Sequence, residues 1–176
     1  GSVDTLALEG RLLKSEAFRQ QGQDQASLLR AAAERYARAH ALATSSGYPD
    51  AYFPGINVAT LRLLLGETAQ AHQAAREVLG QIEPLLAPAE LARRDDAYWL
   101  LATGIEAWLV LGDLARAQAL VAPALLANGR RYSDLASSVR QLRRLLAAQG
   151  LPESALTGFA PPAVAHYTGH MIARDR

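Results

Sequence analysis

Apolar residues recur along this chain at every third or fourth position, which is the spacing of one face of an α-helix. Each apolar series fits a globular helix of roughly 12–20 residues. The series run over residues 6–17, 28–43, 56–64, 71–82, 99–111, 114–125 and 135–146. The pattern predicts an all-α chain of about seven helices.

Short stretches rich in glycine, proline and small polar residues separate these predicted helices. Glycine ends a helix and turns the chain at little cost, because it tolerates a positive φ. Successive helices are therefore expected to pair into hairpins. The breaks lie at residues 20–25, 44–50, 65–67, 86–90, 111–113 and 127–134.

Two of the predicted hairpins repeat one another. An aromatic pair at 98–99 lies 46 residues after one at 52–53, and the turn at 111–113 lies the same distance after the turn at 65–67. A fixed period indicates stacked repeat units. One hairpin alone does not bury its apolar face, so neighbouring hairpins are expected to stack as a right-handed α-solenoid over residues 3–150.

The composition agrees with a helical chain. Half of the residues are hydrophobic and only 6% are aromatic, and most of the hydrophobic half is alanine and leucine. These two residues are the best apolar helix formers. β-Branched residues, which favour strands, are scarce.

Charge and cysteine content narrow the classes of function. The net charge of +1 gives no global field for nucleic acid or a membrane surface, so neither is expected as a partner. The absence of cysteine excludes disulfides and thiol catalysis, and it fits a cytoplasmic protein. Lys14 is the only lysine among 18 basic residues, and this skew is typical of a GC-rich bacterial coding sequence.

The segments "LLLGETAQA" and "LVLGDLARA" resemble the tetratricopeptide repeat, in which a small-residue turn precedes closely packed alanines. The 46-residue spacing is longer than the usual repeat of about 34 residues. A non-catalytic scaffold that binds a protein or peptide in the groove of the stack is the function we expect from such a fold.

A second resemblance covers about residues 50–146. The segments "YFPGINVATLRLLLG", "DDAYWLLATGIEAWLVLG" and "RYSDLASSVRQLRRLL" are together similar to the central, TRAFs-binding region of the apoptosis signal-regulating MAP kinase kinase kinases. This resemblance implies a regulatory helical-repeat region that helps to control an attached effector. The family's last motif is altered here, since Tyr132 is followed by Ser133 and Asp134. The resemblance does not imply that the chain binds TRAF proteins, because a bacterial host would have none.

Residues 151–176 differ from the helical part. Two consecutive prolines at 161–162 predict a linker. The following "AVAHYTGHMI" resembles the first strand of a truncated, Rossmann-like effector domain. His166 and His170 have the spacing of two metal ligands on a helix, but a glycine intervenes and no acidic ligand is near. We therefore expect no metal and no cofactor.

A basic group on the last predicted helix is the main candidate for partner binding. It is either a site for an anionic partner or a solvated end of the stack. Asn57, amid apolar neighbours, either bonds a neighbouring helix end or contacts a ligand. The candidate partner-binding residues are Arg140, Arg143, Arg144, Arg130, Arg131 and Asn57.

Two further residue types have a structural and a functional interpretation. Trp99 is expected in the core, because Phe53 replaces it in the preceding repeat; the alternative is an exposed binding residue. Asp95 or Asp96 is expected to cap the helix that follows.

No arrangement of residues points to catalysis. The chain has no G-x-S-x-G motif, no phosphate-binding glycine loop and no H-E-x-x-H motif. We therefore expect a non-enzymatic interaction module upstream of an effector domain. The alternative is a sensor in which Arg140, Arg143 and Arg144 bind a small anion such as a nucleotide.

Overall fold

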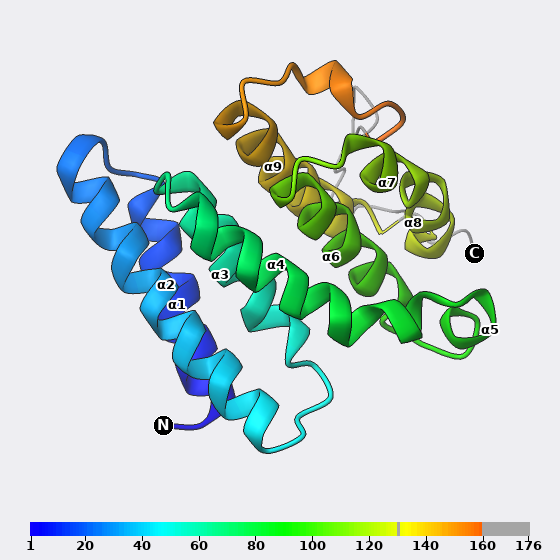
Figure 1. The fold of residues 1–176 in the computed structure, drawn as a ribbon, viewed down its shortest axis with the longest axis horizontal. Helices are drawn as coiled ribbons and strands as arrows, with labels where there is room; N and C mark the ends of the chain where they lie inside the picture. The colour runs from blue at the N-terminus through cyan, green and yellow to red at the C-terminus, as the bar shows by residue number, and fades with distance from the viewer. Residues whose placement is uncertain (130, 160–176) are drawn as a thin grey trace, which may run out of the picture.

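A computed structural model describes residues 1–129 and 131–159, and this part of the chain consists of helices and connecting turns without a strand (Figure 1). The all-α prediction is therefore confirmed for the described residues. The helices are α1 (Val3–Ala17), α2 (Gly22–Ser45), α3 (Tyr52–Leu64), α4 (Thr68–Ile82), α5 (Pro88–Leu91), α6 (Ala97–Val110), α7 (Leu114–Ala119), α8 (Val121–Asn128) and α9 (Tyr132–Ala148), with short 3-10 turns at Glu83–Leu86 and Glu153–Ala155.

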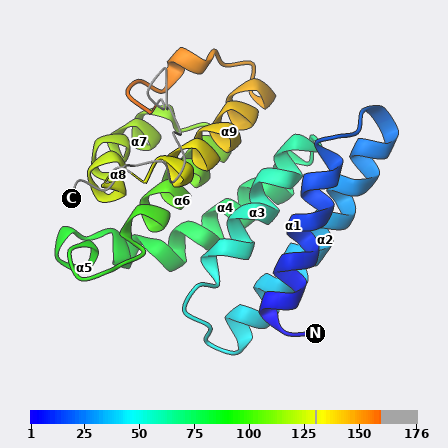
Figure 2. The same ribbon diagram turned by 180° about the vertical axis from the view of Figure 1, so that it is seen from behind.

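Consecutive helices lie side by side and each pair packs against the next. Helix α2 packs on both α1 and α3, and α4 packs on both α3 and α6. Figure 1 shows α2 and α4 in front of α1 and α3, and Figure 2 shows α1 in front of α2 from behind. Helix α9 packs against both α3 and α6, so these three helices meet on one face of the molecule.

The two repeated turns have the same backbone geometry. Gly66 and Gly112 have φ angles of 76° and 78°, in the left-handed region that favours glycine. Each donates to the carbonyl three residues earlier, Gly66 to Leu63 and Gly112 to Leu109, both at 2.9 Å. The predicted repeat therefore appears as two equivalent helix ends.

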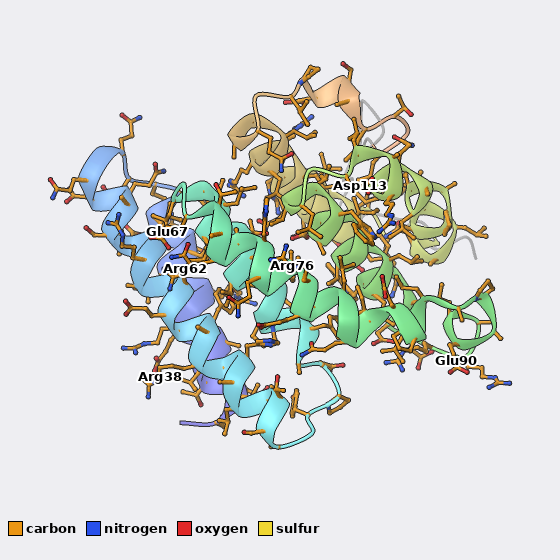
Figure 3. The ribbon with its side chains drawn as sticks, in the orientation of Figure 1. Arg38, Arg62, Glu67, Arg76, Glu90 and Asp113 are labelled. Carbon is orange, nitrogen blue, oxygen red and sulfur yellow. The ribbon has the colours of Figure 1, made fainter. Side chains whose placement is uncertain are left out.

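The acidic residue after each of these glycines has a different partner. Glu67 pairs with Arg62 of α3 and lies 3.7 Å from Arg30 of α2, so its carboxylate joins three helices (Figure 3). Asp113 instead accepts a hydrogen bond from the backbone N–H of Arg116 at 3.0 Å, which caps α7.

The predicted helix over residues 114–125 is wrong in one respect, since the chain breaks it at Leu120 into α7 and α8. Pro123 has no N–H to donate to the carbonyl four residues earlier, and its ring clashes with that carbonyl. The sequence placed a proline inside an apolar series, and the break lies one turn before it.

The core holds the apolar face of every long helix. Tyr36 of α2 and Tyr98 of α6 are among the largest side chains that are fully buried. Gly55 lets α3 approach its neighbours closely, because a Cβ at this position would lie 2.7 Å from Val78 and 2.8 Å from His40. None of the described helices is long and apolar enough to cross a membrane.

The packed unit continues past the predicted domain boundary at residue 150. Leu156 and Phe159 are buried against the main core, and Thr157 exchanges two hydrogen bonds with Gln118 of α7, at 2.9 and 3.0 Å. The linker and strand predicted within 160–176 lie outside the described residues, as do His166 and His170.

Candidate functional site

Helices α1, α3, α6 and α9 surround two adjoining cavities, which together form a groove. The larger cavity, here called the apolar chamber, has a volume of about 480 Å³. The smaller one, here called the polar chamber, has a volume of about 110 Å³. Phe53, Trp99 and Thr103 line both chambers, so the two are continuous.

The apolar chamber exposes large side chains at equivalent repeat positions. Phe53 of α3 is 47% exposed and Trp99 of α6 is 39% exposed, and Leu8 of α1 faces the same chamber at 50%. The preceding residues, Tyr52 and Tyr98, are buried instead. The expectation that Trp99 lies in the core is therefore wrong, because within each aromatic pair the first residue packs inward and the second faces the groove.

An ion pair at the start of α6 forms one wall of the apolar chamber. Asp96 accepts hydrogen bonds from Arg94 at 2.7 and 2.9 Å and from the hydroxyl of Tyr52 at 3.0 Å. The hydrogen bonds from Arg94 hold the pKa of Asp96 below its usual value. Asp96 occupies the N-cap position of α6, but its side chain does not cap the helix, which corrects the role expected from the sequence.

Asn57 brings a lysine into the polar chamber. Its side-chain nitrogen donates to the carbonyl of Phe53 at 2.9 Å, and its oxygen accepts from Nζ of Lys14 at 2.6 Å. Asn57 is only 4% exposed, so this pair of bonds satisfies a buried amide that would otherwise be costly. Asn57 therefore bonds a side chain of another helix and also lines the chamber, which joins the two roles considered for it.

Lys14 and Glu106 place two opposite charges in the polar chamber. Burial lowers the pKa of Lys14, the nearby charge of Glu106 opposes this, and Arg144 and Arg11 lower it further. Both side chains keep partial contact with solvent, because each lines the chamber. Among the ion pairs of the described residues, none includes Lys14 or Glu106.

Glu106 is held by one neighbour from each side of α6. Its Oε2 accepts hydrogen bonds from Gln141 of α9 at 3.3 Å and from Thr60 of α3 at 3.5 Å. Burial raises the pKa of Glu106 to about 7, although Lys14, Gln141 and Thr60 each favour the ionised form. The carboxyl therefore changes its charge near neutral pH.

The arginines predicted as one basic face of α9 point to two places. Arg144 lies over the ring of Phe18 at 3.6 Å, beside the polar chamber, and burial and the charge of Arg140 lower its pKa. Arg140 is exposed one turn earlier. Arg143 instead pairs with Glu153 at 2.8 Å, away from the chamber.

Arg131, which was predicted as part of the basic group, stabilises the start of α9. Arg131 donates to the carbonyl of Asn128 at 3.1 Å, lies 3.6 Å from Asp134 and stands 6.0 Å from the ring of Tyr98. Arg130 lies outside the described residues. Of the predicted residues, Asn57 lines the polar chamber and Arg144 lies close enough to Lys14 to lower its pKa, whereas Arg131, Arg140 and Arg143 line neither chamber.

Two features of the sequence indicate the polar chamber. Lys14 is the only lysine of the chain, and Glu106 is the only charged residue within the apolar helix α6. A charge inside an apolar helix indicates either a buried pair or a binding site.

The described residues contain no group of three histidine or acidic side chains that could hold a metal ion. The comparisons with known proteins add no assignment: no family model, no curated protein and no solved structure matches the chain.

Proposed function

We propose that this chain is a non-catalytic interaction module: a right-handed α-solenoid of tetratricopeptide-like hairpins whose groove binds a segment of a protein partner. The observation that carries the proposal is the pair Phe53 and Trp99, which remain exposed at equivalent repeat positions beside a cavity of about 480 Å³. Large exposed aromatic side chains around a concave apolar surface are typical of binding hot spots.

The resemblance to the TRAFs-binding region supports a regulatory role in a cytoplasmic protein, upstream of an effector domain. In this role the bound segment comes either from another chain or from the attached effector. The small-anion sensor is less well supported, because it needs Arg140, Arg143 and Arg144 to converge on one ligand. The ion pair of Arg143 with Glu153 draws that side chain away from the other two.

A library of random peptides displayed on phage tests the proposal. We expect peptides with a large apolar residue to bind the unmodified chain and to lose about tenfold or more in affinity when Phe53 and Trp99 are both changed to alanine. Leu126→Ala is the control, since Leu126 is 86% exposed on α8 and lines neither chamber. Enriched peptides that bind the double variant as tightly as the control, or no enriched peptide at all, would contradict the proposal.

A further inference from the structure

The polar chamber leaves hydrogen-bonding capacity unused on Lys14. An ammonium group has three N–H donors, and among the described residues Lys14 donates to one acceptor, the side-chain oxygen of Asn57. Lys14 lines a cavity of about 110 Å³, too small for an ordinary ligand but sufficient for one polar side chain.

Only one of the two carboxyl oxygens of Glu106 accepts hydrogen bonds from described residues. Both of its hydrogen bonds, from Thr60 and Gln141, go to Oε2. Oε1 has no hydrogen bond to a described residue, and it is not among the polar atoms that are sealed from solvent without a partner. One oxygen of Glu106 is therefore free to face an occupant of the chamber.

The charges around the chamber favour an anionic occupant. Arg11 and Arg144 lie close enough to Lys14 to lower its pKa, and Arg140 lies close enough to Arg144 to do the same. Glu106 is the acid that opposes them at Lys14. Lys14 and Glu106 are the charged residues that line the polar chamber, whereas Asp4, Asp50 and Asp96 line the apolar chamber together with Arg11. Because Glu106 is partly neutral near pH 7, the charge nearest to an occupant of the polar chamber is positive.

We propose that the polar chamber binds the side-chain carboxylate of an aspartate or glutamate of the partner segment, with Lys14 donating to one oxygen and protonated Glu106 donating through Oε1 to the other. This inference rests on the proposed function, because the apolar chamber next to it holds the rest of the segment. The proton on Glu106 comes from solvent on binding and returns to solvent on release.

The coupling to pH follows from the surroundings of Glu106. The groups that face it are Lys14 from α1, Thr60 from α3 and Gln141 from α9, with Tyr98 nearby on its own helix. Two carboxyl groups at hydrogen-bonding distance do not both ionise, so the bound carboxylate raises the pKa of Glu106 further. Since this pKa is about 7 before binding, affinity should fall about tenfold between about pH 6 and about pH 8.

Selection of the same phage library at about pH 6 tests the inference. The displayed peptides are fused at their C-termini, so an enriched acid must be a side chain. We expect the enriched peptides to carry an aspartate or glutamate close to the large apolar residue, and to lose about tenfold in affinity when this acid is changed to its amide. Calorimetry at about pH 8 in two buffers of different ionisation enthalpy should show uptake of about one proton.

Three variants assign the effect to the chamber. Glu106→Gln keeps a donor without a titrating group, so its affinity should hardly change with pH. Lys14→Met should bind the acidic peptide and its amide alike. Arg38→Met is the matched control, because Arg38 is exposed on α2, away from both chambers (Figure 3). Circular dichroism confirms that each variant is folded.

The outcomes separate this inference from the proposed function. Peptides that need Trp99 but carry no acid, or binding without proton uptake, overturn this inference alone. This inference is also overturned if the Lys14→Met variant still binds the acidic peptide more tightly than its amide. It is likewise overturned if free acetate displaces the peptide at equal concentration. Absence of any enriched peptide overturns the proposed function as well.

Discussion

The hairpin α3–α4 and the hairpin formed by α6 with α7 and α8 share an aromatic pair and a glycine turn at the same spacing, and they differ where they face the groove. Tyr52 and Tyr98 are equivalent and buried, whereas Phe53 and Trp99 are equivalent and exposed. A further equivalent pair is Thr60 and Glu106, which lie 46 residues apart in sequence and are hydrogen bonded at 3.5 Å.

This difference separates the requirements of the fold from those of the site. The first residue of each aromatic pair packs inward in both hairpins and is a tyrosine in both. Glu106 lines the polar chamber, whereas Thr60 is fully buried and lines neither chamber. Of these two equivalent positions only 106 carries an ionisable side chain. Lys14 of α1 lines the same chamber and places an opposite charge near Glu106.

The largest expected effect comes from the two residues of one aromatic pair. Tyr98→Ala removes a fully buried ring and its hydrogen bond to Ser138, so we expect a loss of about 3–5 kcal/mol in the free energy of unfolding. Trp99→Ala removes a ring that faces the groove, and we expect a loss below about 1 kcal/mol. Urea denaturation of both variants measures the difference, and equal losses would show that Trp99 is a packing residue.

A second prediction concerns the close contacts of α3. Gly55→Ala places a Cβ within 2.8 Å of both Val78 and His40, and the ring of His40 is fixed by its 2.8 Å contact with the carbonyl of Ala51. We expect a loss of about 1–3 kcal/mol in the free energy of unfolding, as for other overpacked cores. In α6 the equivalent position holds a buried leucine, Leu101, so the two copies differ here as well.

Gly80→Ala is the control for this contact. Gly80 lies within α4, and a Cβ there would meet nothing within 4 Å. Alanine is the better helix former by about 1 kcal/mol, so this variant should be slightly more stable than the unmodified chain. If thermal melting shows that both glycine variants gain stability, the close packing of α3 against α2 and α4 is not as described.

A third prediction uses the titration of Glu106. In the unfolded chain this carboxyl ionises near its usual pKa of 4.5, whereas in the folded chain it keeps its proton up to about pH 7. The folded state binds more protons in that window, so Glu106 makes stability fall as the pH rises from about 4.5 to about 7 and has no further effect above it.

Glu106→Gln should therefore remove this fall. At about pH 8 we expect the variant to be about 1–2 kcal/mol more stable, below the full value of the pKa shift because the chamber admits solvent. At about pH 4, where the carboxyl is neutral in both states, the difference should vanish. Thr60→Val removes a hydrogen bond that favours the ionised form of Glu106, so in this variant the fall in stability should extend to a slightly higher pH. A stability gain of Glu106→Gln that is the same at both pH values would contradict the raised pKa.

The helical framework was predictable from the sequence because it depends on local rules. Apolar spacing located the long helices, and Gly66 and Gly112 marked two equivalent turns, since glycine alone adopts their positive φ without strain. The break at Leu120 was missed, although the signal was present as Pro123, because the apolar spacing continues unchanged through it.

The groove was less predictable because it depends on how distant helices meet. Asn57 and Arg144 were candidates and lie near the polar chamber, but nothing in the spacing indicates that α1 brings Lys14 to Asn57. The sequence also did not show that the side chain of Trp99 faces the groove. Aromatic residues at one position of both repeats fit a core position and a groove position equally well. The packing of α9 on both α3 and α6 encloses the polar chamber, and this contact between distant helices cannot be read from the apolar spacing.

The smallest expected effects come from the acids of the two repeated turns, where one position acts through different chemistry. Glu67→Ala breaks partly exposed ion pairs with Arg62 and Arg30, and Asp113→Ala removes the N-cap of α7 together with a more exposed, 3.5 Å ion pair to Arg116. We expect losses of about 0.5–1 kcal/mol for each. The loss from Glu67→Ala should shrink in high salt, because salt screens an ion pair, whereas most of the loss from Asp113→Ala should remain. Urea denaturation at low and high salt distinguishes them, and an identical salt dependence would mean that the two turns are held by the same interaction.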